Sequence, residues 1–401
     1  MQSSPSAGPG ELMPGILLTP AAESVSSATP PRAEPAGLRV SPWLEFLVVG
    51  GATLLLFPLS WALQRGFGAD PVLLGAGFLT FHAAYVLNDP HFAVTYLLFY
   101  RDVRARALGR EVPFAQRLRY WISGFVLPAA LVTWAALALA LHSAAALGWI
   151  VQLMFLLVGW HYVKQGFGVL SVLSARRGVS LRARERQLLL AHCFAAWAFA
   201  WANPSMPAGE FEEKGVVYWG VAHPRWLELM TGAVLAASTI ALGALLLRNW
   251  RRERRALPLA PLASFLITIW SWTIYSRIDP MVQYLIPALH SLQYFYFVWL
   301  MQGNRALSEE GPPRFGRSAS TRLAALALSA WALGWLLLRG LPALLDELLV
   351  PPVQRGGLPD ALGTTPYFAA FFAVVNIHHY CMDHVIWRRE NPETRFLRAA
   401  Q

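Results

Sequence analysis

The sequence predicts an all-α fold, a polytopic transmembrane helical bundle of about ten helices. Of its 401 residues 56% are hydrophobic and only 14% are charged, whereas a soluble domain carries nearer a quarter charged residues. The apolar residues also gather in about ten stretches, each near the roughly 20 residues that cross a bilayer as a helix. These observations exclude a soluble globular protein.

The apolar stretches are expected to be helices, because a lone segment in lipid must satisfy its own backbone hydrogen bonds. They are also too long and continuous for the strands of a membrane barrel. Tryptophans near many of their ends fit the aromatic belt of a membrane interface, for example Trp43, Trp61, Trp121, Trp219, Trp226 and Trp387. In chain order the predicted spans are 43–63, 71–99, 121–142, 148–173, 187–203, 226–247, 259–275, 281–301, 321–341 and 366–387.

The formal net charge of +10 indicates orientation and not a nucleic-acid partner. All but two of the 33 basic residues are arginine, and they gather in the loops that follow the even-numbered spans. The arginine-rich segments are 101–119, 176–186, 248–255, 305–322 and 388–398. Because this alternation is the positive-inside pattern, we expect both termini to be cytoplasmic.

The same patterns divide the chain into three regions. Residues 1–41 are rich in Ser, Pro, Ala and Gly and lack the charged and apolar regions of a signal peptide, so they are expected to form a disordered leader. Residues 42–388 form the transmembrane domain, and 389–401 a basic cytoplasmic tail. The arginine- and alanine-rich composition is typical of a high-GC bacterium, which predicts an inner-membrane location.

Histidines inside the spans are the strongest functional signal, because ionisable groups are costly within a bilayer. His91, His161, His290 and His378 lie ten or fifteen residues before the first cytoplasmic arginine of four spans that run in the same direction. At 1.5 Å per residue their depths agree within about 8 Å. Imidazole suits iron, copper and zinc, so four imidazoles at one level predict a shared metal site.

Two further histidines are alternative members of this ligand set. His82 lies somewhat higher in its span, and His379 points about 100° away from His378 around the helix. A ligating histidine usually gives its second ring nitrogen to an acceptor, and Asp383 follows His379 at the i+4 position. His379 therefore has a candidate partner on its own helix face.

Other polar residues inside the spans have less defined roles. The Asn-Asp-Pro segment at 88–90 is expected to interrupt its helix, which membranes tolerate only inside a bundle. Lys164 is deep enough either to need an anionic partner or to extend towards the interface. His384 lies near the cytoplasmic boundary and has no assigned role.

The motifs of several enzyme classes are missing from the sequence. It contains no glycine-rich phosphate loop, no GxSxG, no HExxH and no CxxC. Nucleotide hydrolysis, serine hydrolysis, HExxH proteolysis and thiol redox chemistry therefore have no sequence support. Acids are also scarce inside the spans, which disfavours a carboxylate-rich di-iron site.

Four short histidine motifs occur in a fixed order along the chain. They are Asp89-Pro90-His91, Trp160-His161-Tyr162 with Gly166, His290-Ser291 continuing through Phe295-Tyr296-Phe297-Val298-Trp299, and His378 with Asp383. Together they resemble the Brp/Blh family of integral-membrane β-carotene 15,15'-dioxygenases. The resemblance covers some forty residues, and Tyr294 stands where the family's third motif has its second histidine. It implies a related architecture and an iron site on histidines of several helices, with His82, His379 or Tyr294 completing the ligands, more strongly than it implies carotene as substrate.

We therefore predict an enzyme, a membrane-embedded non-haem iron oxygenase that uses O2 as co-substrate. Its substrate would be lipophilic, either a carotenoid or a lipid-like molecule, held in an aromatic-walled cavity. The candidate substrate-binding residues are Trp160, Phe295, Phe297 and Trp299, and the candidate catalytic residues are Tyr294 and Asp383.

Three other functions use the same histidines. Two imidazoles can serve as the axial ligands of a haem, or several can line a proton or solute path in a transporter. In a purely structural bundle they would form interhelical hydrogen bonds.

The predicted orientation is testable with reporter fusions. A fluorescent protein fused to the C-terminus should fluoresce, and alkaline phosphatase inserted after His142, in the loop between the third and fourth spans, should be active, because these positions are expected on opposite sides of the membrane. Cells expressing each fusion give the measurement directly. Phosphatase activity from the C-terminal position would contradict the orientation.

Overall fold

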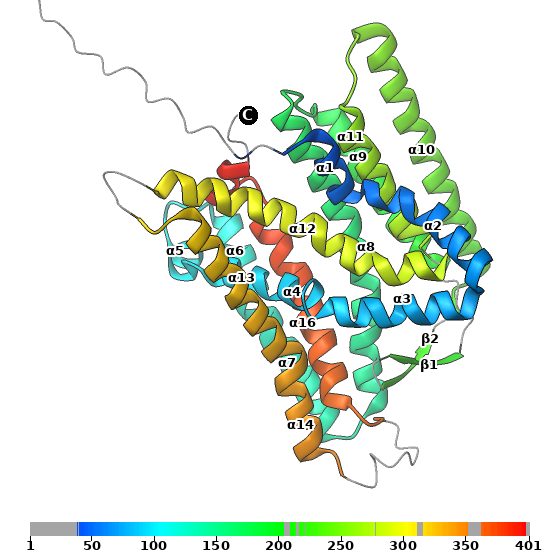
Figure 1. Cartoon of the computed structure of the whole chain (residues 1–401), viewed down its shortest axis with the longest axis vertical. Helices are drawn as coiled ribbons and strands as arrows, with labels where there is room; N and C mark the ends of the chain where they lie inside the picture. Colours follow the sequence, from blue (N-terminus) through cyan, green and yellow to red (C-terminus); the bar gives the residue numbers. More distant parts are fainter. Residues whose placement is uncertain are drawn as a thin grey trace, which may run out of the picture. The chain divides into compact units, whose positions relative to one another are not determined.

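The computed structural model describes residues 38, 40–203, 209–213, 216–220, 222–276, 278–310, 316–351 and 362–397 (Figure 1). All of them belong to one compact unit of the chain, Ala36–Gln401. The predicted leader, 1–41, lies outside the described residues except for Leu38 and residues 40–41. Leu38 donates its backbone N–H to the Asn304 side chain (2.9 Å), so this end of the leader is attached to a helix of the bundle.

Every predicted span is helical. The α-helices are α1 (Pro42–Phe46), α2 (Ala52–Phe67), α3 (Ala69–Ala84), α4 (Asn88–Tyr100), α5 (Val103–Leu108), α6 (Phe114–Trp121), α7 (Leu127–Ala140), α8 (Ala144–Arg176), α9 (Ala183–Ala202), α10 (Arg225–Glu253), α11 (Leu259–Leu266), α12 (Pro280–Glu309), α13 (Ala319–Trp335), α14 (Leu341–Leu349) and α16 (Pro366–Ile386). Four π-helical segments continue neighbouring α-helices into longer rods: η1 (Leu47–Gly51), η2 (Ile122–Val126), η3 (Ile267–Ile274) and η4 (Leu336–Gly340).

The strands among the described residues form one small antiparallel hairpin. Strand β1 (Gly209–Glu213) pairs with β2 (Val216–Gly220), with Gly209 opposite Gly220. The hairpin connects α9 to α10, within a loop of the predicted topology. It therefore leaves the prediction of a helical membrane domain unchanged.

Six helical rods of the described chain are long and apolar enough to cross a membrane. They are Pro42–Phe67, Ala69–Tyr100, Phe114–Ala140, Ala144–Arg176, Arg225–Glu253 and Ala319–Leu349. The other four predicted spans do not meet this criterion. They are α9, α11 with η3, α12 and α16. The rod of α11 and η3 is short. Helices α12 and α16 carry buried histidines, and α16 also carries Asn376 and Asp383, and these polar residues lower their hydropathy. A count of ten crossings stays a prediction.

Large apolar side chains are exposed on the outer faces of the helices. Leu74, Ile240 and Leu259 are 77%, 73% and 81% exposed, and many other leucines and tryptophans are more than half exposed. Soluble monomers rarely expose contiguous apolar surface of this extent. Helices with such outer faces suit a lipid environment.

The polar helices α12 and α16 lie inside the bundle. Helix α16 packs on α4, α7 and α8, and α12 packs on α3, α4 and α13 (Figure 1). Many of their polar side chains are buried, including Gln293, Asn376 and Asp383. Polar groups inside a membrane protein face the interior because lipid offers them no hydrogen bonds.

The expected interruption before His91 is present. Helix α3 ends at Ala84 and α4 begins at Asn88, so Asn88, Asp89 and Pro90 form the first turn of a new helix. The Asp89 carboxylate pairs with Arg339 of η4 at 2.9 Å. At Gly334 of α13 an added Cβ would lie 2.4 Å from the Asp89 carbonyl oxygen, so only glycine allows this close approach. Helix α13 and η4 thereby fix the start of α4.

The described part of the predicted basic tail, residues 389–397, folds back on the bundle. Residues Pro392–Leu397 form a 3₁₀ helix, η5, that packs on α12. The buried Glu393 binds Arg106 and Arg305. Asn304 donates to the carbonyl of Phe396 (2.8 Å). These contacts tie the end of the described chain to the arginine-rich side of the bundle.

The Asp89–Arg339 pair should be essential for the stability of this region. The Asp89→Asn variant should unfold with a free energy lower by about 3–5 kcal/mol, because removing one partner of a buried ion pair leaves the other charge uncompensated. Denaturant unfolding in detergent micelles measures this change. Arg389→Gln, at an exposed site, is the control and should change stability by less than about 0.5 kcal/mol; equal effects of the two substitutions would contradict the role of the pair.

Candidate metal centre

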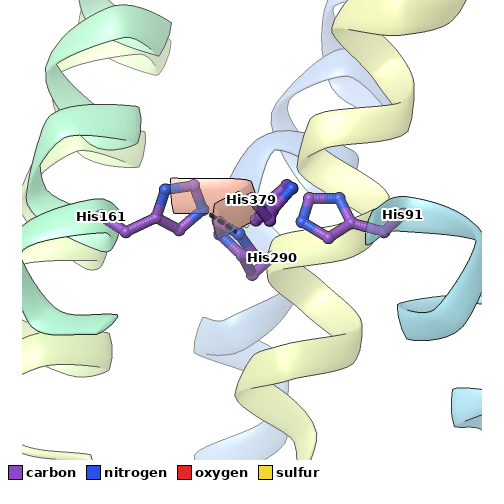
Figure 2. Close-up of side chains that lie close together, drawn as sticks. All are labelled: His91, His161, His290 and His379. Atoms are coloured by element: carbon purple, nitrogen blue, oxygen red, sulfur yellow. Dashed lines mark hydrogen bonds between the residues drawn. The ribbon is translucent and has the colours of Figure 1, made fainter. Parts of the chain in front are cut away.

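Four histidines from four helices meet inside the bundle. His91 of α4, His161 of α8, His290 of α12 and His379 of α16 point towards one another (Figure 2). One ring nitrogen from each lies within 4.8 Å of the corresponding nitrogens of the others. All four side chains are buried, with at most 4% of each residue exposed. This group is referred to below as the histidine cluster.

The spacing of the histidine cluster fits one metal ion after a small adjustment. The Nε2 atoms of His161 and His290 lie 3.0 Å apart, close to the separation of two adjacent ligands that are each about 2.0–2.1 Å from one ion. Opposite ligands at that bond length are about 4.2 Å apart. Because the cluster spans up to 4.8 Å, at least one imidazole must move inwards by a few tenths of an ångström to bind.

Most nitrogens of the cluster have no hydrogen-bond partner. Both ring nitrogens of His91, both of His379 and Nδ1 of His290 are buried without one. Each buried polar atom left in this state costs about 1–3 kcal/mol, and native proteins contain few of them. The donor set therefore fits a metal ion, which accepts the lone pairs that no protein group uses.

A carboxylate lies beside the cluster on α16. The Oδ2 atom of Asp383 is 3.4 Å from Nε2 of His379 and 3.9 Å from Nε2 of His161. Its other oxygen accepts from the Tyr294 hydroxyl (3.0 Å) and from Thr95 (3.3 Å). Tyr294 and Thr95 also bond to each other at 2.6 Å. The candidate catalytic pair, Tyr294 and Asp383, therefore shares one network that touches the cluster.

A chain of amides holds the helices of the cluster in register. Gln165 of α8 donates to Gln293 of α12 at 2.7 Å, and Gln293 donates to the carbonyl of Val49 at 2.6 Å. At the next residue, Gly50, the backbone of η1 has a φ of 133°, a conformation that only glycine adopts readily. The kink at Gly50 thus lies next to the Val49 carbonyl, which the Gln293 side chain binds and which connects η1 to the helix of His290.

Aromatic rings surround the cluster. Tyr380 stacks on His161 with ring centroids 4.7 Å apart, and Tyr162 lies 4.6 Å from His290. Phe92 lies 5.0 Å from His379. These rings were not among the candidate site residues, although each directly follows a histidine of the cluster in the sequence. That adjacency was the available signal.

Two of the six candidate ligands lie outside the cluster. His378 directs its ring nitrogens to the Tyr96 hydroxyl (3.0 Å) and to the carbonyl of Ser123 (2.9 Å), so both are already in use. His82 is exposed on α3 and bonds to the carbonyl of Phe78 (2.8 Å). The structure thus brings together His379 and not His378, because the two neighbours point in different directions from one helix.

The four candidate substrate-binding aromatics are dispersed. Phe295 alone lies beside the cluster, with its ring 6.2 Å from that of His91. Trp160 contacts His384 at 5.2 Å. Phe297 and Trp299 lie beside Tyr296 and belong to the hydrophobic core around α4, α12 and α16. Those two side chains lie about two turns beyond His290 on α12.

Comparison with protein-family models, with curated proteins and with solved structures finds no match for this chain. The resemblance to the Brp/Blh dioxygenases therefore rests on the four short histidine motifs and stays an expectation. What the structure adds is a buried four-histidine group that can hold a metal ion.

Metal content should distinguish His379, a member of the cluster, from its neighbour His378 on α16. His379→Ala, and a His161→Ala/His290→Ala double variant, should purify with little or no metal, whereas His378→Ala should keep a near-stoichiometric amount. Elemental analysis of detergent-purified protein measures the content, and the elution profile in size-exclusion chromatography checks folding. Metal loss in His378→Ala but not in His379→Ala would contradict the assignment of the cluster.

Proposed function

We propose that this protein is a multi-pass membrane enzyme that uses a non-haem iron ion and O2 to oxidise a lipophilic substrate. The observation that carries the proposal is the convergence of four imidazoles, most of whose nitrogens have no other partner, inside an apolar helical bundle. Histidine is the commonest side-chain ligand of protein metals, and intramembrane ionisable groups mark functional sites. A bacterial inner membrane is the proposed location.

The choice of iron rests on the ligand type and on the sequence motifs. Imidazole binds iron, copper and zinc, whereas thiolate favours zinc, Cu(I) and iron–sulfur clusters, and the histidine cluster contains no cysteine. The resemblance of three of the cluster's motifs to those of the iron-dependent Brp/Blh dioxygenases favours iron among these metals. Bound iron with an open coordination position would supply the reactivity towards O2.

The protein's own residues would hold protons and exclude water. Asp383 faces His379 and His161 with one oxygen and takes a hydrogen bond from Tyr294 with the other. Because Thr95 bonds to the same hydroxyl, a proton can pass along Thr95, Tyr294 and Asp383 to the edge of the cluster. Tyr162, Tyr380, Phe92 and Phe295 would form the apolar surroundings of the reacting carbon.

The geometry disfavours a haem at the same place. A haem iron takes its axial ligands on two opposite sides, and the porphyrin occupies the plane between them. Four imidazole nitrogens within 4.8 Å of one another, which arrive from four helices, leave no such plane free. A transporter that uses these histidines as a proton path stays as the alternative, and it requires no bound metal.

The proposal predicts iron without haem, and activity that depends on Tyr294. Purified protein should contain iron, show no Soret band, and consume O2 when supplied with carotenoids or lipids. Tyr294→Phe should keep its iron but lose roughly 100-fold in turnover, because it removes a proton-transfer group without removing a ligand. Tyr100→Phe, whose hydroxyl bonds to the carbonyl of Gly124 at a distance from the cluster, is the matched control. Protein that binds no metal despite iron supplementation would reject the enzyme in favour of a transporter or a structural bundle.

A further inference from the structure

Basic side chains without acidic partners meet where α6, α8 and α16 adjoin. Lys164 lies on α8, Arg119 on α6, and His384 and Arg388 at the end of α16. Arg388 donates to Nε2 of His384 (2.6 Å). Trp160 is one turn before Lys164, and its ring lies 5.2 Å from that of His384. We refer to Arg119, Lys164, His384 and Arg388 as the basic group.

Several other buried or partly buried cations of the bundle are paired with an acid. Arg106, Arg177, Arg255 and Arg339 each bind a carboxylate. In contrast, Arg119, Lys164 and Arg388 form no ion pair with any described residue, although each is only partly exposed. Partly buried cations of like sign that lack a counter-charge are unfavourable in a membrane environment.

The members of the basic group are close enough to repel one another. Arg388 bonds to His384, and Trp160, one turn before Lys164 on α8, packs on the same histidine. The positive charges of Arg388 and Lys164 repel each other, and that of Arg119 repels Arg388. The exposed Glu390 attracts Arg388. One exposed acid does not neutralise three cations, so the group carries a net positive charge that an anion can balance.

The group lies on the side of the histidine cluster that the arginine-rich loops predict to be cytoplasmic. Lys164 follows His161 by three residues, or about 4.5 Å along α8, and Arg388 follows His379 by nine residues, or about 13 Å. A lipid whose head group bound here would extend its tail along Trp160 towards the level of the cluster. Basic pockets between membrane helices on the cytoplasmic side are known to take anionic lipid head groups.

We infer that the basic group binds the anionic head group, a carboxylate or a phosphate, of an amphipathic lipid. If the proposed function holds, on which this step rests, the substrate is such an anionic lipid, and the carbon that reacts lies part-way along its tail. Trp160, which packs on His384, would then contact the tail next to its head group.

Lipid binding to the full-length, detergent-purified protein tests the inference. Dioleoyl phosphatidylglycerol and oleate should bind more tightly than dioleoyl phosphatidylcholine. Lys164→Gln and Arg388→Gln should each weaken binding of the anionic lipids about fivefold, which is the expected contribution of one basic residue near a membrane surface. Lys164→Arg should keep the affinity. Arg389→Gln, an exposed neighbour, is the matched control and should bind as the wild type does.

The outcomes separate this inference from the proposed function when metal content is measured on the same samples. Equal affinity for the anionic and zwitterionic lipids, or unchanged binding by Lys164→Gln, would overturn the inference even in iron-loaded protein. Competition by inorganic phosphate at concentrations as low as those of the lipid would also overturn it, because the site would then take a free anion. Anionic-lipid binding by a protein without metal would support the head-group site and reject the oxygenase.

Discussion

The central constraint on this protein is that several imidazole nitrogens are buried in an apolar bundle with no partner. Both nitrogens of His91 form no hydrogen bond, and those of His379 form none either, with only the Asp383 carboxylate 3.4 Å from Nε2; in lipid no water can compensate for them. A single metal ion can accept one lone pair from each of the four imidazoles at the same point. Folding of this region and metal binding are therefore expected to be coupled.

The surrounding fold holds the four helices of the histidine cluster in position. Helices α4 and α8 belong to apolar rods, whereas α12 and α16 are polar and lie inside, where α16 packs on α4 and α8 and α12 packs on α4. The break before α4 sets the position of His91, and Asp89 ties that break to Arg339 of η4. On α12, Gln293 connects the helix of His290 to Gln165 of α8 and to the kink at Gly50. Helix α16, the fourth ligand helix, is held by the hydrogen bonds of Asp383 to Tyr294 and Thr95.

The sequence predicts the level of the cluster but not the rotation of every helix. Counting residues from the arginine-rich loops is sufficient to select His91, His161 and His290, because helix rise is constant. It does not separate His378 from His379, whose choice depends on the rotation of α16. The carbonyl of Ser123 that binds His378 lies in the π-helical segment η2, and the hydrophobic pattern of the sequence does not indicate such a segment. Likewise, the dispersal of Phe297 and Trp299 from the cluster follows from packing on α4 and α16, which residue type does not specify.

The most direct test of the central claim is X-ray absorption spectroscopy at the edge of the metal bound by the purified protein. We predict a single ion with four nitrogen or oxygen neighbours at about 2.0–2.2 Å, and with the outer-shell scattering that three or more imidazoles produce. The His379→Ala variant should lose one imidazole or lose the metal, and His378→Ala should give the wild-type spectrum. A bound ion with fewer than three imidazole ligands, or a spectrum unchanged by His379→Ala, would contradict the account.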